Sequence, residues 1–555
     1  YCGDLSACLH TIYNELSAGR PVIVHLKNTT VSGVSKHANR TSTYEYHLSG
    51  SGWNDPKTAR EAKQRQKEHS TNLLYGTIGV VFLVIAIAAV IWKSNIIPKT
   101  ATAATVNGEK YTAAEVNFYY QSVYRSFLQN NSYFISYLGL DTSSSLKNQT
   151  INATAASMMG VEEGSSWFDY MMDNAIHQMT TIQKGLEAAK AEGYQFPDSV
   201  QAQYQDSMDS LKTAATSSGM SVNKYLQQNL GSTMTEKVYG QQVLKLLQYQ
   251  DYANAYADRL TYTDEQLEEA YQADTKTYDK ASWEYVVVSG AAESTTDADG
   301  NTVQPTDEET EAAKAAAKET ADKILAAYKA GTSLESAAGN YEKASYYSSD
   351  STAYYDGTTG NWLFDGARKS GDTAVLEVGS SYYVALFHSC GREEYNTVDV
   401  RHILIQPESG TLSTDDEGYD AEQEELKAAA RTKAEEILAE WKAGDATEDS
   451  FAKLAMEDSA DGSKYTGGLY TRITKGQMVE AFNDWCFDSS RKSGDTDVVD
   501  TTYGSHVMYF VGTDLPAWAA AVTDNLQTED TNKWNEELTK DAVTEQKDFG
   551  MKFVG

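Results

Sequence analysis

Cysteine and basic residues are the two scarce classes in this sequence. The 555 residues include four cysteines, which form no CxxC pair and no zinc-ligand spacing, so the composition argues against a disulfide-dense scaffold and a structural metal site. Lysine and arginine number 46 against 79 acidic residues, and the net charge of −33 argues against a nucleic-acid partner. Hydrophobic residues, at 41%, are numerous enough for packed cores, and the length suggests about three or four domains.

One stretch predicts a membrane crossing. Residues 73–92 (LLYGTIGVVFLVIAIAAVIW) are 20 consecutive residues without a charge, which is the length of a transmembrane helix. Five lysines and arginines lie just before it, between residues 57 and 67, whereas only Lys93 and Lys99 follow closely. The sequence therefore predicts a single-pass anchor with the more basic side in the cytoplasm.

This orientation divides the chain into two parts. Residues 1–72 become a cytoplasmic head, fragmentary or disordered in part, and residues 93–555 lie outside the cell membrane. An acidic, cysteine-poor exterior part suits the surface of a Gram-positive bacterium. A cleaved signal peptide is the alternative, because residues 101–103 (Ala-Thr-Ala) could form a cleavage site.

Residues 93–270 are predicted to form a helical domain. Asn107-Gly108 is a tight-turn signal, and Thr112 with Glu115 forms a capping box that opens a helix. Successive helical patterns rich in Ala, Gln, Leu and Tyr follow. The many tyrosines either pack this domain's core or line a groove for unfolded peptide.

An internal repeat organises the next part of the chain. Two segments recur almost unchanged: ADKILAAYKAG (321–331) returns as AEEILAEWKAG (434–444), and WLFDGARKSGDT (362–373) returns as WCFDSSRKSGDT (485–496). Each unit opens and closes with a β-type run and contains helices between them. The fold class is therefore α+β, with two tandem domains at residues 271–393 and 394–513.

The second unit resembles the parvulin-type peptidyl-prolyl isomerases. The resemblance covers nearly all of the unit and is carried by VRHILI (400–405), EDSADGS (457–463), GGL (467–469), KGQMVEAF (475–482) and YGSH (503–506). Residues 104–555 resemble, more loosely, the extracytoplasmic PrsA/SurA-type foldases. That resemblance implies a chaperone-like role for the helical domain, with residues 514–555 returning to complete it.

Isomerisation of an X–Pro bond has modest chemical needs. Amide resonance imposes a barrier of roughly 18–20 kcal/mol, and a pocket that favours the twisted amide lowers it without a nucleophile, a metal or a cofactor. Met478 and Phe482, four apart on an expected helix, point the same way and can form an apolar proline pocket, with Leu469 as a wall.

The family resemblance supplies the polar residues. It implies that His402 and His506 form the floor of the site, that Asp458 is the polar group facing the rotating carbonyl, and that Gln477 and Tyr503 lie at the rim. Each residue also has a plain structural interpretation: Met478 and Phe482 as core packing, His402 as a satisfied core histidine, Asp458 as a turn or cap residue. Whether the histidines exchange protons or act as a hydrogen-bonded scaffold stays open, and amide rotation favours the scaffold.

The first unit lacks this set of residues. Tyr285 replaces His402, Tyr383 replaces His506, and no Gln-Met-x-x-x-Phe segment precedes Trp362. We therefore expect a degenerate parvulin-like domain without catalysis, serving as a spacer or a peptide-binding surface.

Clients and rival functions follow from the same features. The loop at residues 407–417 is acidic and contains no lysine or arginine, which argues against recognition of phosphoserine–proline. Unfolded or newly secreted polypeptides that contain proline, including basic ones, are the expected partners. The rival is a holdase chaperone with a vestigial isomerase site. A cysteine peptidase using Cys2 or Cys8 with His37 is a third reading, which the short head segment supports poorly.

Overall fold

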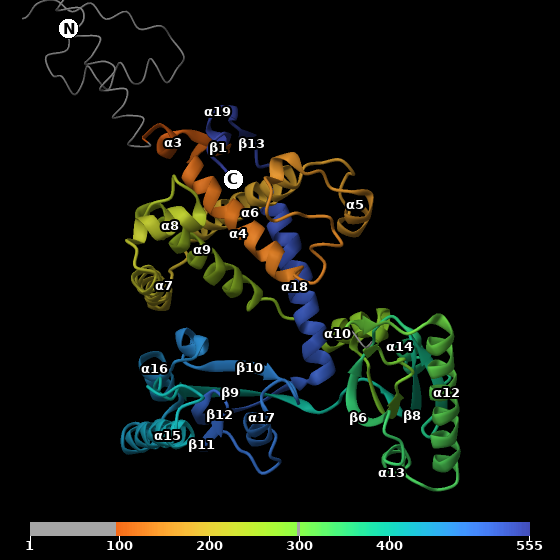
Figure 1. The fold of residues 1–555 in the computed structure, drawn as a ribbon. Coiled ribbons are helices and arrows are strands. Elements are labelled where there is room, and N and C mark those ends of the chain that lie inside the picture. The colour runs from red at the N-terminus through yellow and green to blue at the C-terminus, as the bar shows by residue number, and fades with distance from the viewer. Residues whose placement is uncertain (1–95, 297–299) are drawn as a thin grey trace, which may run out of the picture. The chain divides into compact units, whose positions relative to one another are not determined.

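The computed structural model describes residues 96–296 and 300–555 (Figure 1). The cytoplasmic head and the anchor expected at residues 73–92 lie outside these described residues. Within the described ranges, no helix is both long enough and apolar enough to cross a membrane.

A mostly helical domain begins with a short hairpin. Its elements are, in chain order, α3 (Ile96–Thr100), β1 (Thr102–Val106), β2 (Glu109–Thr112), α4 (Ala113–Asn130), η1 (Leu146–Asn148), α5 (Ala153–Met159), α6 (Trp167–Glu192), α7 (Asp198–Ser217), α8 (Val222–Leu230) and α9 (Glu236–Ala257). The hairpin β1–β2 turns at Asn107 and Gly108, and both adopt the positive φ that a two-residue hairpin turn needs. The predicted capping box is confirmed at α4, where Thr112 and Glu115 bond each other's backbone N–H groups.

The C-terminal segment contributes to this same helical domain. It contains α18 (Ala517–Thr539), β13 (Thr544–Gln546) and α19 (Asp548–Met551). Strand β13 pairs antiparallel with β1 and so extends the hairpin to three strands. Trp534 of α18 stacks on Tyr256 of α9 with ring centroids 4.3 Å apart, and Val554 is buried in the domain's core. The short strands leave no alternating pattern in the sequence, because each is at most five residues long.

The first repeat domain is a four-stranded sheet with helices on its faces. Two helices that pack against α18, α10 (Asp264–Ala273) and α11 (Thr275–Tyr278), precede it. Its own elements are β3 (Lys280–Val288), β4 (Thr295–Thr296), β5 (Thr302–Val303), α12 (Asp307–Lys329), α13 (Leu334–Ala338), β6 (Ala344–Ala353), α14 (Thr358–Leu363), β7 (Thr373–Val378) and β8 (Ser381–Gly391). The antiparallel strand order is β6-β3-β8-β7. Helix α12 runs along one face, where Val286, Val384 and Ile324 form the core (Figure 1).

The second repeat domain has the same plan. Its elements are β9 (Asn396–Ile405), α15 (Tyr419–Ala443), α16 (Glu448–Asp458), η2 (Gly462–Thr466), β10 (Leu469–Ile473), α17 (Glu480–Cys486), β11 (Thr496–Thr501) and β12 (Gly504–Pro516). The strand order β10-β9-β12-β11 matches that of the first repeat domain position by position. One sheet face packs its core against α15 and α16, and a second core, with Phe482 of α17, fills the opposite face. The candidate site lies on the α17 side.

Candidate active site

Two histidines occupy the centre of the second sheet. His402 on β9 and His506 on β12 lie on neighbouring strands and are 2% and 5% exposed. Their rings stack with centroids 5.2 Å apart, and their Nδ1 atoms are 3.1 Å apart. A hydrogen bond of this length needs one protonated and one unprotonated Nδ1, so the two rings hold complementary tautomers.

The outer nitrogens of the pair indicate which tautomers these are. His402 Nε2 lies 3.3 Å from Asp461 Oδ1 and 3.1 Å from Ser463 Oγ, while His506 Nε2 lies 2.8 Å from Thr501 Oγ1. The ionised carboxylate accepts only, so His402 carries its proton on Nε2 and presents a bare Nδ1. His506 then donates from Nδ1 and accepts the Thr501 hydroxyl proton at Nε2. The result is one chain of hydrogen bonds that runs from Thr501 to Asp461.

Asp461 is the carboxylate of this network. Its Oδ1 accepts hydrogen bonds from the Ser463 backbone N–H at 2.8 Å, the Ser463 hydroxyl at 2.6 Å and the Tyr470 hydroxyl at 3.0 Å. The hydrogen bond to His402, together with those from Ser463, holds the pKa of the Asp461 carboxyl well below its usual range. Burial and the Asp461 charge raise the pKa of Tyr470 to about 12, which keeps its phenol protonated as a donor.

Sequence reasoning missed Asp461 and singled out Asp458 instead. Asp458 is the last residue of α16 and is half-buried, and the contact with His402 comes from Asp461. A local signal did exist. Asp461-Gly462-Ser463 is an Asx-turn pattern, in which the aspartate accepts the N–H two residues ahead and caps the short helix η2.

The loop that holds Asp461 is fixed to the sheet by a charged residue and a glycine. Arg401 on β9 donates to the backbone carbonyls of Thr466 and Gly467 and also pairs with Glu448. Gly468 adopts φ +74°, and a Cβ at that position would lie 2.2 Å from the His402 carbonyl oxygen. Only glycine permits this close approach, which sets the distance between the Asp461 loop and His402.

An aromatic wall encloses the histidine pair. The Phe482 ring is nearly perpendicular to both imidazoles, with centroid distances of 5.5 Å to His402 and 5.4 Å to His506. Tyr470 stacks on His402 at 5.0 Å. Met478 is half-buried and packs against the same apolar cluster as Phe482. The polar network therefore borders an apolar surface, the combination that gripping a proline ring beside a polarisable amide requires.

Three further candidates lie outside this cluster, and two expectations were wrong. Leu469, expected as a wall of the proline pocket, pairs on β10 with Arg401, whose side chain bonds Glu448 of α16, so Leu469 lies on the sheet face away from His402, and Tyr470 takes the place beside the histidine. Gln477 is exposed, and its Oε1 accepts from the backbone N–H of Thr474. Tyr503 is 61% exposed in the turn between β11 and β12. Met478 was expected on a helix with Phe482, yet α17 begins at Glu480, so Met478 lies in the preceding turn and reaches the cluster from there.

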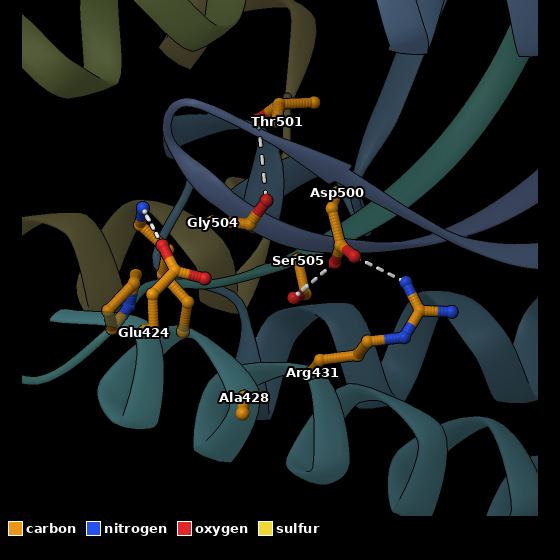
Figure 2. Close-up of a pocket in the computed structure, with 9 residues that line it drawn as sticks. Glu424, Ala428, Arg431, Asp500, Thr501, Gly504 and Ser505 are labelled. Carbon is orange, nitrogen blue, oxygen red and sulfur yellow. Dashed lines mark hydrogen bonds and ion pairs between the residues drawn. The ribbon is translucent and has the colours of Figure 1, made fainter. Parts of the chain in front are cut away.

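A cavity of about 350 Å³ lies next to this network, between α15 and the β11–β12 turn. Figure 2 shows Arg431 paired with Asp500, which also accepts a hydrogen bond from the Ser505 hydroxyl. Thr501 lines the same cavity and bonds His506, so the cavity lies one residue away from the histidine pair. Its cations are already paired with carboxylates of the same domain, including Lys427 with Glu424.

The buried His506 predicts a pH dependence. Burial, with a smaller contribution from His402, lowers the pKa of His506 from 6.5 to about 4. Between these two pH values the unfolded chain binds more protons than the folded domain. The free energy of unfolding should therefore fall by about 2–3 kcal/mol as the pH is lowered through this window.

Nuclear magnetic resonance of the chain labelled with ¹³C at histidine would check this. The His506 signal, assigned by its disappearance in His506→Gln, should titrate with a midpoint near 4. Titration near 6.5, the ordinary value, would show that the ring is not held in a dry environment.

Comparisons with known proteins give one family model and several solved structures that resemble the chain. Residues 384–512 match the family model of the PPIC-type PPIase domain. Among solved structures, the PPIase domain of TbPar42 is 26% identical, and the alignment covers 20% of this chain and 98% of that chain at a TM-score of 0.16. PrsA from Bacillus subtilis is 14% identical over 69% of this chain and 90% of that chain, with a TM-score of 0.25. A chain from a structure of SurA-like chaperones of Campylobacter jejuni is 23% identical over 26% of this chain and 52% of its own, with a TM-score of 0.16. No curated protein matches the chain in sequence.

Proposed function

We propose, on the premise that residues 384–512 form a parvulin (PPIC-type) peptidyl-prolyl isomerase domain, that this chain is a foldase acting on unfolded or newly secreted polypeptides. The observation that carries the proposal is the Asp461–His402–His506–Thr501 hydrogen-bond chain beside the Phe482 ring. His402, His506 and Asp461 are the catalytic residues of the proposal. Phe482 and Met478, beside Tyr470, receive the proline, and Gln477 and Tyr503 contact the flanking peptide.

The proposed mechanism is electrostatic. In a planar amide, resonance places partial negative charge on the carbonyl oxygen, and twisting the C–N bond returns that electron density to nitrogen. A fixed carboxylate near the carbonyl oxygen therefore disfavours the planar amide relative to the twisted one. The histidine pair holds Asp461 in place, and its complementary tautomers need no net proton transfer during the reaction.

The assay that tests the function is protease-coupled isomerisation of an unphosphorylated Ala–Pro peptide by the chain. We expect acceleration over the spontaneous rate, and we expect Tyr383→Phe in the first repeat domain to leave kcat/KM unchanged. A folded chain without any acceleration would remove the catalytic proposal. A loss of activity in Tyr383→Phe would instead place catalysis in the first repeat domain and contradict the proposal.

Phosphorylation of the substrate should reduce turnover. The loop at residues 407–417 carries four carboxylates and no cation, and the two cations of helix α15 that line the adjacent cavity, Lys427 and Arg431, are already paired. A phosphate beside the proline therefore meets uncompensated negative charge. We expect kcat/KM for a phosphoserine–proline peptide to be about fivefold or more below that of the serine–proline peptide, a like-charge cost of about 1 kcal/mol. Faster turnover of the phosphorylated peptide in the same assay would contradict this.

We also propose that residues 73–92 hold the chain in a cell membrane with residues 93–555 outside. The uncharged run and the basic residues before it support this orientation. Proteolysis of intact cells should then digest residues 93–555, and alkaline carbonate should leave the chain in the membrane fraction. Release by carbonate would favour the cleaved signal peptide.

A holdase function is the second candidate, and a surface of the helical domain favours it. The loop between α4 and η1 exposes three aromatic rings: Tyr133 at 95%, Phe134 at 55% and Tyr137 at 64%. Solvent-exposed aromatic clusters of this kind fit non-specific contact with unfolded chains. Suppression of aggregation that survives Met478→Ala but is lost in a Tyr133→Ser, Tyr137→Ser variant would separate this function from isomerisation.

A further inference from the structure

Part of the candidate site lies on one stretch of chain, residues 461–473, which comprises the Asp461 turn, η2 and β10. Asp461 and Ser463, at its start, contact His402. Tyr470, further along, stacks on the His402 ring and donates to Asp461. We call residues 461–473 the site segment. Its position relative to His402 sets the geometry of the hydrogen-bond network.

The site segment receives limited support from its own sheet. Strand β10 is an edge strand that bonds only to β9, and this pairing is irregular between Tyr470 and Ile473. Helix η2 is a five-residue 3₁₀ helix outside the sheet. Arg401 and Gly468 hold the middle of the segment. Because edge strands and short helices open locally more easily than central strands, contacts on either side of that middle restrict the segment further.

Helix α7 of the helical domain contacts the first half of the site segment. The helical domain and the second repeat domain belong to one compact unit of the chain. Lys464 Nζ and the Tyr465 hydroxyl both donate to Asp206 Oδ2, at 2.6 Å and 2.7 Å. These hydrogen bonds lower the pKa of the Asp206 carboxyl, which keeps it an ionised acceptor. Since the two donors directly follow Ser463, Asp206 holds the chain next to the residues that contact His402.

Arg472 is the contact at the other end of the site segment. It adopts φ +52°, in the left-handed region that residues with a side chain rarely enter. Its backbone N–H donates to Asp399 Oδ1 at 2.8 Å. Its guanidinium lies 3.0 Å from Asp524 Oδ1 and 3.2 Å from Gln527 Oε1, both on α18. Such a conformation persists where several contacts fix it together.

Helix α18 is itself held by the helical domain. Gln527 Nε2 donates to the backbone carbonyls of Ala257 and Leu260, at the end of α9, at 3.1 Å and 3.4 Å. Helix α18 also packs along α6 and α9. The helical domain therefore contacts the site segment twice, through α7 near its start and through α18 near its end.

We infer that Asp206 and Asp524 of the helical domain are positioning residues for isomerisation. They fix the site segment at two points and thereby the distance between Asp461 and His402. Neither aspartate belongs to the hydrogen-bond network of the site, so each acts through the site segment. The inference rests on the proposed function and goes beyond it, because it gives the helical domain a role in catalysis.

Isomerisation of the Ala–Pro peptide by the full chain tests this inference. The double variant Asp206→Ala, Asp524→Ala leaves the second repeat domain unchanged in sequence. The side chains of Asp206 and Asp524 are 47% and 60% exposed on their helices, where alanine is well tolerated. We expect kcat to fall about four- to sixteenfold, the product of a two- to fourfold loss for each partly exposed ion pair. KM should stay within about twofold, because Phe482 and Met478 lie outside the site segment.

The double variant Asp209→Ala, Glu529→Ala is the matched control. Asp209 on α7 pairs with Lys212 of the same helix, and Glu529 on α18 pairs with Lys533 of the same helix. The control removes one carboxylate from each of the two helices and should keep wild-type kinetics. An equal loss in the control, or wild-type kcat in a folded Asp206, Asp524 variant, would overturn the inference. A change in KM alone would also overturn it, since the two aspartates would then serve substrate binding.

Nitrogen-15 magnetic resonance of the histidine-labelled chain gives a readout besides activity. In the wild-type chain, His402 should carry its proton on Nε2, which faces Asp461. In the Asp206, Asp524 variant, a less fixed Asp461 should let the His402 signals, assigned by their loss in His402→Gln, move toward a mixture of tautomers. The control should keep the wild-type signals. Unchanged His402 signals beside a reduced kcat would overturn the inference.

Failure of the proposed function would look different. A wild-type chain that does not accelerate isomerisation would remove the function. The His402 signals of the same variants would still show whether the two aspartates hold the site segment.

Discussion

Replacing Asp461 with asparagine should lower kcat/KM for Ala–Pro isomerisation by about 100-fold, the loss typical of removing one preorganised electrostatic group. The substitution keeps the size of the side chain and its acceptor for the Ser463 N–H, but it removes the negative charge beside His402. Without that charge, the tautomer of His402 is no longer fixed, because an amide can also donate to Nε2. The measurement is the protease-coupled assay, with folding checked by near-ultraviolet circular dichroism.

Asp458→Asn provides a matched control for this prediction. Asp458 lies three positions earlier, at the end of α16, and is half-buried. Its replacement should change kcat/KM by less than about threefold, within the range of an ordinary surface charge. If the Asp458 variant lost activity and the Asp461 variant kept it, the carboxylate assigned from the family resemblance would be the functional one.

Loss of the apolar wall should be the second large effect. Phe482 is 2% exposed and contacts both imidazoles, so Phe482→Ala opens a cavity and costs about 3–5 kcal/mol of stability as well as the proline contact.

Met478→Ala tests the proline contact with a smaller loss of stability, because Met478 is half-buried in a turn. We expect it to lower kcat/KM about tenfold, mostly through KM, since the pocket binds proline in the planar and the twisted states alike.

Val479→Ala is the control for this variant. Val479 follows Met478 in the chain and is 38% exposed, so its truncation removes a similar amount of apolar surface outside the wall. It should retain wild-type kinetics. Wild-type kinetics in a folded Met478→Ala chain, or an equal loss in both variants, would show that Met478 does not line the proline pocket.

The sequence by itself determined the internal repeat, the strands that open and close each unit with helices between them, and the parvulin domain. These features depend on local patterns. An alternating strand or an amphipathic helix is encoded by neighbouring residues, and a repeat is recognised by comparing its two copies within the sequence. It also singled out both histidines and Phe482, which the structure brings together, because the resemblance is carried by short motifs around them. The capping box at Thr112 and Glu115 is local in the same way.

Only the tertiary structure decided which groups meet. Asp461 reaches His402 from a loop about 60 residues further along the chain, and its neighbour Ser463 is 61 residues from the histidine it contacts. Several carboxylates stand in that loop region, and spacing alone does not distinguish them. Thr501, the pairing of β13 with β1, and the stacking of Tyr347 on Tyr285 are also contacts between segments distant in sequence. Strand register and loop anchoring place these groups, and both depend on long-range packing that no local pattern encodes.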